Sequence, residues 1–291
     1  MASDNLIALI KVLRERTGAG MMDCKKALEA TENDVEKAID WLREKGIAKQ
    51  AAKASRIAAE GMASTLVNGN EAIILEINCE TDFVAKGDRF QALVGNVAKV
   101  TLEKKPACID CARELTNQAF VDATVSMGEK LSYRRFEIVS KEEGQEFGAY
   151  VHMGGKIAVV TVTDKNAEVA KGLAIHIAAN NPQYISMNDI PADVLEHERA
   201  VTLEAAKNDE KLANKPEKVL AGIVEGKVRK MLSESVLEEQ VYLMGDGTQT
   251  VGQYLKSAGV KLVKFVRYGL GDGLEKRVDN FAEEVMKEAN K

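Results

Sequence analysis

The sequence predicts an α+β protein with three parts: a small N-terminal three-helix bundle, two related α+β subdomains, and a helix at the C-terminal end. Three observations support this fold class. Apolar residues recur at helical spacing over residues 4–45. The order strand, turn, strand, connection, helix then occurs twice. A long helical stretch, interrupted by Pro216, precedes the last predicted strand and indicates an inserted antiparallel helical hairpin.

Residues 1–46 are expected to form the bundle. Its first helix has an apolar face, the segment Thr17-Gly-Ala-Gly20 ends that helix, and Gly46 is the expected stop of the third helix. Met21 and Met22 follow the glycines. They either fill the core or form an adaptable contact surface, and the core is the favoured alternative because methionine packs irregular gaps.

A helical linker is expected over residues 47–60, where alanine is frequent. Lys49, Lys53 and Arg56 fall on one face of this helix. Such a charged stripe is usually solvated, and contact with an acidic partner or RNA is the less favoured alternative.

The first subdomain is expected over residues 61–140. Two strands flank the turn at Asn68-Gly69, a helix follows with Phe90 inward, a second helix covers about 108–125, and a strand covers 133–140. Residues 141–268 repeat this order, with the helical hairpin inserted at about 190–235. Exposed hairpins of this kind pack, bind partners or self-associate. Residues 269–291 form the C-terminal module, with one amphipathic helix from Leu274 to Asn290.

The candidate site is the connection after the second strand, Cys79-Glu-Thr-Asp-Phe-Val-Ala-Lys86, because it sets Phe83 among polar residues. An aromatic side chain there either folds back as a buried anchor, the commoner outcome, or enters a pocket of another protein. The equivalent connection of the second subdomain, residues 163–167, has no aromatic residue. A subdomain of this kind therefore folds without an aromatic residue in this connection, which favours a role for Phe83 in binding another protein.

Composition limits the possible function classes. The net charge of −5 and the pI of about 5.5 disfavour wholesale nucleic-acid binding. Apolar residues make up 45% of the chain, but no run approaches the length of a membrane span, and the first residues do not resemble a secretory signal. We therefore expect a cytoplasmic protein without membrane or direct nucleic-acid contacts. Its four cysteines do not form a disulfide framework.

The residues capable of chemistry form no recognisable reactive site. Cys108-Ile-Asp-Cys111 has redox spacing but falls in an expected helix, and no second cysteine pair supports zinc, so neither role is expected. His176 is expected to be a hydrogen-bonded core histidine. The glycines near residues 154 and 269–273 do not match phosphate-binding motifs. The sequence predicts neither an enzyme nor a bound cofactor or metal.

Two long motifs carry a family resemblance. The segment from Arg14 to Leu28 and the segment from Asn78 to Lys86, with Thr-Asp-Phe-Val, closely resemble bacterial elongation factor Ts, and the likeness extends over the whole chain. The resemblance implies a guanine-nucleotide exchange factor that binds elongation factor Tu with GDP, promotes GDP release and so allows GTP to bind. It also implies a ubiquitin-associated-like bundle and possible homodimerisation through the hairpin.

The resemblance also implies roles for individual residues. Asp82 and Phe83 would enter the GTPase domain of the partner and disturb the network that holds its magnesium, while Thr81 and Val84 shape the loop. Further partner contacts are implied for residues of the bundle and of the second subdomain: Arg14, Met21, Met22 and His152. The segments at Lys86-Gly-Asp88 and near Cys108 depart locally from the family pattern.

Two other function classes remain open. An interaction adaptor would bind a translation partner without changing the rate of nucleotide release. An oxidoreductase would need Cys108 and Cys111.

Overall fold

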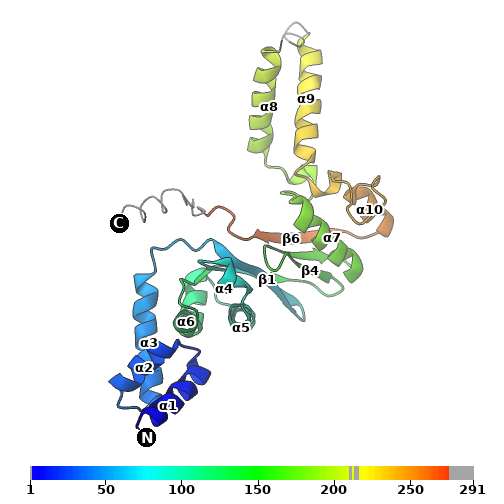
Figure 1. Ribbon diagram of the computed structural model, residues 1–291. Helices are drawn as coiled ribbons and strands as arrows, with labels where there is room; N and C mark the ends of the chain where they lie inside the picture. The colour runs from blue at the N-terminus through cyan, green and yellow to red at the C-terminus, as the bar shows by residue number, and fades with distance from the viewer. Residues whose placement is uncertain (1, 210–211, 213–215, 275–291) are drawn as a thin grey trace. The chain divides into compact units, whose positions relative to one another are not determined.

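The computed structural model describes residues 2–209, 212 and 216–274, and these residues divide into two compact units (Figure 1). The first unit comprises the described residues of 1–140, 151–158 and 268–291. The second comprises those of 141–150 and 159–267. The α+β class is confirmed: an N-terminal three-helix region precedes two small three-stranded sheets. The finer domain boundaries stay a prediction.

The N-terminal bundle consists of α1 (Ala2–Thr17), α2 (Met21–Ala30) and α3 (Val35–Ala52). Asp34 caps α3, since its carboxylate accepts a hydrogen bond from the Lys37 amide at 3.1 Å. The buried core of the bundle includes one residue from outside it, Val125 of α6 (Ile109–Met127). The other core residues come from the three helices and from the loop between α1 and α2: Leu13, Ala19, Cys24, Ala27, Leu28, Ala38 and Leu42.

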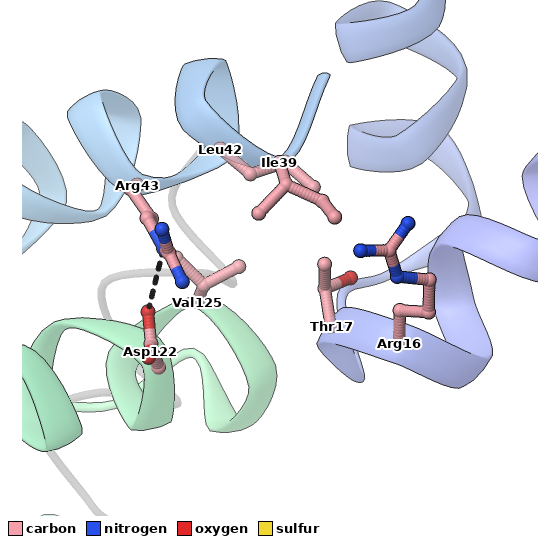
Figure 2. Close-up of a pocket in the computed structure, with 7 residues that line it drawn as sticks. All are labelled: Arg16, Thr17, Ile39, Leu42, Arg43, Asp122 and Val125. Atoms are coloured by element: carbon pink, nitrogen blue, oxygen red, sulfur yellow. Dashed lines mark ion pairs between the residues drawn. The ribbon is translucent and has the colours of Figure 1, made fainter. Parts of the chain in front are cut away.

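Gly46 does not end the third helix, which continues to Ala52. A Cβ atom at Gly46 would lie 2.6 Å from Val125 Cγ2 and 3.0 Å from Val121 Cγ1. The glycine therefore allows α3 and α6 to approach closely. A pocket of about 100 Å³ lies in this contact region, and the Arg43 and Asp122 side chains beside it form an ion pair at 3.7 Å. Figure 2 shows this ion pair together with Val125 and Leu42, which also line the pocket.

The predicted stripe of Lys49, Lys53 and Arg56 is only partly solvated: the Lys49 and Arg56 side chains are 40% and 53% exposed, and each of the three cations has a partner within the chain. Lys49 forms an ion pair with Asp23 at 2.9 Å. The Lys53 ammonium donates to the Gly128 carbonyl, and Arg56 pairs with Glu80 at 3.2 Å. The Lys49 ion pair joins α3 to α2, and the contacts of Lys53 and Arg56 attach the segment after α3 to the rest of the first unit.

The first sheet contains β1 (Glu60–Asn68), β2 (Glu71–Cys79) and β3 (Ser132–Ser140), paired antiparallel in the order β1-β2-β3. The hairpin turn consists of Gly69 and Asn70, one residue later than expected, and Gly69 has a φ of +61°. Three helices follow β2: α4 (Asp82–Lys86), α5 (Asp88–Lys104) and α6. Apolar residues of β2, α5 and α6 form one core, which includes Phe90 as predicted.

The second sheet repeats this plan, as predicted. It contains β4 (Glu146–His152), β5 (Ile157–Thr163) and β6 (Leu262–Gly269), in the order β4-β5-β6. The helix after β5 is α7 (Ala167–Asn180), which buries Leu173 and Ile177. His176 is fully buried, and its ring nitrogens contact the Gln240 side chain at 2.9 Å and the Leu243 amide at 3.1 Å. The prediction of a hydrogen-bonded core histidine is confirmed.

The inserted hairpin consists of α8 (Ala192–Lys207) and α9 (Glu217–Ser233), which lie side by side (Figure 1). Pro216 precedes the first residue of α9 as expected. Short helices flank the hairpin: η1 (Met187–Asp189), η2 (Leu237–Glu239) and α10 (Val251–Ala258). Helix α10 was not predicted, although its capping box of Thr250 and Gln253 is a signal that the sequence contains. The predicted C-terminal helix lies outside the described residues.

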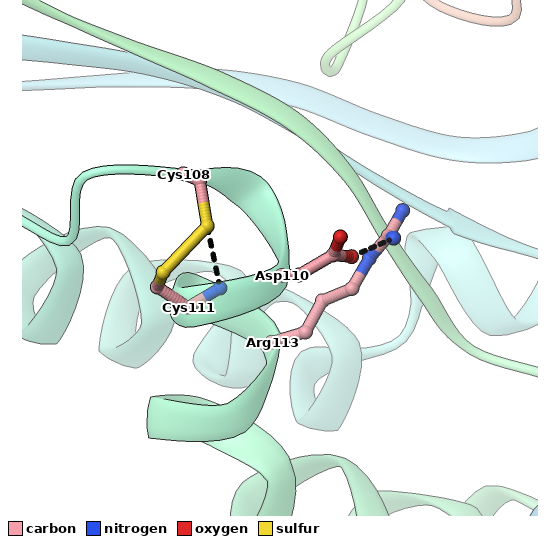
Figure 3. Close-up of a disulfide and its surroundings, with 4 residues drawn as sticks. All are labelled: Cys108, Asp110, Cys111 and Arg113. Atoms are coloured by element: carbon pink, nitrogen blue, oxygen red, sulfur yellow. Dashed lines mark hydrogen bonds and ion pairs between the residues drawn. A yellow bond between two sulfur atoms is a disulfide. The ribbon is translucent and has the colours of Figure 1, made fainter.

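Cys108 and Cys111 are joined by a disulfide, contrary to the expectation from the sequence (Figure 3). The two Cα atoms are 5.2 Å apart, within the ordinary range for a disulfide. The first turn of α6 accounts for this proximity, because a three-residue spacing in a helix brings side chains to the same face. Among the described residues, no helix is both long and apolar enough to cross a membrane.

Candidate partner-binding site

The candidate exchange segment forms a short helix, α4, directly after β2. Thr81 caps its first turn, and its hydroxyl oxygen accepts a hydrogen bond from the Val84 amide at 3.3 Å. Asp82 and Lys86, one turn apart, form an ion pair at 2.6 Å. The Gly87 amide then donates to the Val84 carbonyl and α4 ends. The sequence predicted a connection of mostly polar residues here, and the structure has a helical turn.

Phe83 lies on the solvent side of α4. Its side chain is 84% exposed, whereas Ala85 is 7% exposed and belongs to the core beneath the sheet. Val84 packs against the same core. Because neighbouring residues of a helix point in different directions, anchoring Val84 and Ala85 leaves Phe83 outside. The favoured alternative, a buried anchor, was therefore wrong for this aromatic.

One carboxylate from another part of the first unit holds the start of α4. Glu129 Oε2 accepts hydrogen bonds from the Glu80 and Thr81 amides, each at 3.0 Å, and Glu129 Oε1 accepts from the Thr81 hydroxyl at 2.6 Å. Glu129 directly follows Gly128, the left-handed residue that ends α6 at a φ of +75°. Glu129 could not be predicted from the sequence, because a terminating glycine does not show where the next residue points.

The segment before α4 is fixed by further contacts. Glu80 accepts a hydrogen bond from the Lys130 amide at 2.6 Å. The Cys79 thiol donates to the Thr81 carbonyl at 3.1 Å, and burial raises the pKa of this thiol to about 12. Cys79 is thus a protonated structural group and not a nucleophile.

The tip of α4 presents an aromatic ring beside a carboxylate. The hydrogen bond from Lys86 lowers the pKa of Asp82, and the same contact raises the pKa of Lys86. Asp82 therefore carries its negative charge at neutral pH next to the exposed Phe83. The structure brings all four predicted residues of this segment, Thr81 to Val84, together at one short helix.

A second surface lies on the bundle. A groove of about 590 Å³ has both apolar and basic walls. Its lining residues include Ile7, Ile10, Lys11, Arg14, Met21 and Arg89. Met21 is 58% exposed and Met22 61% exposed, so the prediction that they fill the core was wrong.

The groove is joined to the helix that follows α4. Arg89, in the first turn of α5, lines the groove and donates a hydrogen bond to the Gly18 carbonyl at 2.9 Å. Only Gly87 separates α4 from α5. Arg89 thus links the loop between α1 and α2 to the base of the exposed segment, and the sequence did not predict this contact.

His152, the remaining predicted contact residue, ends β4 and does not line this groove. Its carbonyl accepts hydrogen bonds from the amides of Gly155 and Lys156, both at 3.1 Å, in the turn before β5. Among the described residues, no group of three or more His, Cys, Asp and Glu side chains could hold a metal ion.

An exposed aromatic on a well-supported helix, together with a groove lined by apolar side chains and by Arg14 and Arg89, is typical of a protein that binds another protein. Comparisons with known families show which kind of protein-binding protein this is. The family model for elongation factor TS matches residues 80–272, and the model described as elongation factor Ts, mitochondrial, N-terminal matches residues 2–51. The chain belongs to the elongation factor Ts family. Membership implies a nucleotide-exchange factor that acts on elongation factor Tu.

Proposed function

We propose that this chain promotes GDP release from elongation factor Tu by inserting Asp82 and Phe83 next to the magnesium site of the GTPase, after which GTP binds. The observation that carries the proposal is the exposure of Phe83 on a helix fixed from within by Ala85 and from the side by Glu129. A ring held on a rigid support loses little conformational entropy on entering a partner.

The free energy from burying Phe83 is smaller than the free energy that faster GDP release requires, so other surfaces must contribute to binding. A thousandfold faster release requires about 4 kcal/mol of differential stabilisation. Burying one phenylalanine supplies roughly 1.5–3 kcal/mol. The remainder comes from other contacts, and by reciprocity the partner state that holds the nucleotide weakly is the state that binds this chain best.

The groove on the bundle is the proposed second contact. Arg14 and Met21, which line the groove, and the adjacent Met22 bind the GTPase domain, and the exposure of both methionines supports this role. His152 and the second subdomain bind the rest of the partner. In the same proposal the protein is a bacterial-type cytoplasmic factor with the domain layout predicted above, and the hairpin of α8 and α9 mediates homodimerisation.

The test compares GDP release and binding for one substitution. Phe83→Ala should slow the release of a fluorescent GDP analogue from elongation factor Tu by about 10- to 150-fold, which corresponds to the 1.5–3 kcal/mol of one buried phenylalanine. Its affinity for the nucleotide-free partner should fall much less. Leu115→Ala is the matched control, because Leu115 is an exposed apolar residue, 41% accessible, on α6.

Two results would contradict the proposal. Equal losses in release rate and affinity would show that Phe83 contributes only general binding energy. If the unsubstituted chain binds elongation factor Tu and leaves the release rate unchanged, the protein is an adaptor.

A further inference from the structure

The disulfide between Cys108 and Cys111 lies on the surface, at the first turn of a long helix. Cys108 is the N-cap of α6, Cys111 is three residues further on, and both residues are exposed (Figure 3). The other two cysteines, Cys24 and Cys79, are fully buried. One cysteine pair is therefore open to reagents in solution, and the other thiols are enclosed by the cores of the first unit.

We propose that Cys108 and Cys111 form a reversible dithiol–disulfide exchange site, whose substrates are external thiols and disulfides such as the two forms of glutathione. Exposure gives a reagent access to the bond, and the first turn of α6 holds the two Cα atoms 5.2 Å apart, a separation that suits a disulfide. The site is independent of the proposed exchange function.

The fold holds this turn without the disulfide. The Cys111 amide donates a hydrogen bond to Cys108 Sγ at 3.1 Å, so the sulfur caps the helix whether or not it is bonded to Cys111. Arg113 Nε donates to the Tyr133 carbonyl at 2.8 Å, and Ala112 and Thr116 are buried beneath the turn. Opening the bond therefore leaves α6 attached to β3 and to the core.

The two sulfurs differ in their electrostatic surroundings. Cys108 Sγ lies at the positive end of α6, where the Cys111 amide points at it, and such a position stabilises a thiolate. The nearest negative side chain of the turn, Asp110, is paired with Arg113 at 2.8 Å (Figure 3). Cys108 is thus the better leaving group, and Cys111 is the sulfur that an external thiolate attacks.

The reaction balances as two successive exchanges. A glutathione thiolate attacks Cys111 Sγ, the bond between the cysteines breaks, and its electron pair leaves on Cys108 Sγ. A second glutathione thiolate attacks the glutathione sulfur of the mixed disulfide, which releases Cys111 and forms glutathione disulfide. The protein gains two electrons and two protons in total. The reverse sequence, with glutathione disulfide as oxidant, restores the bond.

The buried cysteines should take no part. Burial raises the pKa of the Cys24 thiol and raises that of Cys79 to about 12, so neither provides a thiolate at neutral pH. Their enclosure also excludes a reagent of the size of glutathione. Glutathione should therefore react only with Cys108 and Cys111, and the reaction can be followed by labelling these two cysteines.

The first experiment equilibrates the native full-length chain with glutathione buffers from fully oxidised to fully reduced, then alkylates it and counts labels by intact mass and peptide mapping. The expected result is one reversible transition that adds two labels, both on Cys108 and Cys111, with unchanged helical circular dichroism. The double variant Cys108→Ser/Cys111→Ser should show no transition. A pair that stays in one state throughout, labels on Cys24 or Cys79, or loss of helix on reduction would overturn the proposal.

A second experiment tests the assigned polarity with single variants. In Cys111→Ser the remaining surface thiol is Cys108, and the midpoint of its alkylation rate against pH should fall below the ordinary cysteine value of about 8.5. In Cys108→Ser, Cys111 should react with a midpoint near that value and retain a stable mixed disulfide with glutathione. Identical midpoints, or the reverse order, would remove the electrostatic basis of the site.

Discussion

At the scale of single residues, Glu129 determines where the exposed segment begins. Its carboxylate accepts three hydrogen bonds from Glu80 and Thr81, the two residues that connect β2 to α4. Two of the donors are backbone amides that precede the first helical turn. A helix of five residues cannot maintain itself, because nucleation is costly and few internal hydrogen bonds form. Much of the order of α4 must therefore come from Glu129 and from the burial of Ala85.

Removing this carboxylate should loosen α4 and leave the groove on the bundle intact. Glu129→Ala should increase amide hydrogen exchange at Val84 to Gly87 by about 10-fold or more, since each lost hydrogen bond costs roughly 0.5–1.5 kcal/mol. Nucleotide release by the partner should slow in parallel. Glu129→Gln is the graded control, because its one oxygen still accepts from both amides. Unchanged exchange at α4 in Glu129→Ala would show that Ala85 alone is sufficient.

At the scale of elements, the contact between α3 and α6 explains why a glycine stands at position 46 although the helix does not end there. Glycine near the end of an apolar period is a common helix stop, and the local sequence offers no contrary signal. The observed reason for glycine is the approach of Val121 and Val125 from a helix far along the chain. The same limit applies to Lys49 and Arg56, whose partners Asp23 and Glu80 are 26 and 24 residues away.

This contact predicts opposite effects for two glycine substitutions in helices. Gly46→Ala should lower the midpoint of thermal unfolding, because its Cβ would overlap with Val125, and overpacking costs about 1–3 kcal/mol. Gly226→Ala in α9 is the matched control, since its Cβ would meet no atom within 4 Å. The control should stabilise by about 0.5–1 kcal/mol through helix propensity. Equal stabilisation by both substitutions would mean that α3 and α6 can move apart to accept the added methyl group without a loss of stability.

At the scale of the whole molecule, periodic patterns were the reliable source of prediction. Short apolar runs and turn residues predicted the strands of both sheets, and apolar residues at helical spacing predicted the N-terminal bundle. The repeated order of elements also located Phe83 correctly as an addition, because residues 164–166 between β5 and α7 contain no helix. Patterns of this kind predict where helices and strands lie and which of their faces are buried. They do not report which distant polar groups meet, so Glu129 and Arg89 were not foreseen.

Glu76 links several segments of the first unit and gives a prediction for its pH stability. This carboxylate is fully buried in β2 and contacts Arg134 at 2.9 Å, Arg135 at 2.7 Å and the Gly271 amide at 2.9 Å. Burial alone would raise the pKa of Glu76, but the hydrogen bonds from Gly271, Asn78 and Arg134, with the charge of Arg135, hold the pKa below its usual value.

A lowered folded-state pKa means that the native state favours the charged form. The stabilisation by Glu76 is therefore present above the unfolded-state pKa of about 4.3 and is lost as the pH falls through the lower folded-state value. Urea unfolding measured across this range should show a decline in the free energy of unfolding towards acid. Glu76→Gln should reduce stability at pH 7 by about 3 kcal/mol and flatten the decline. If the free energy of unfolding of Glu76→Gln falls with acid as steeply as that of the original chain, the decline is caused by other carboxylates.

The presence of Val125 in the core of the N-terminal bundle affects how the chain can be divided. A fragment that ends after α3 would lose this side chain and leave a hole lined by Leu42 and its neighbours. A fragment that begins at β1 would expose Val121 and Val125 to water. Neither half would report the properties of the intact protein, so binding and exchange are better separated by substitutions at Met21 and Phe83 than by cutting the chain.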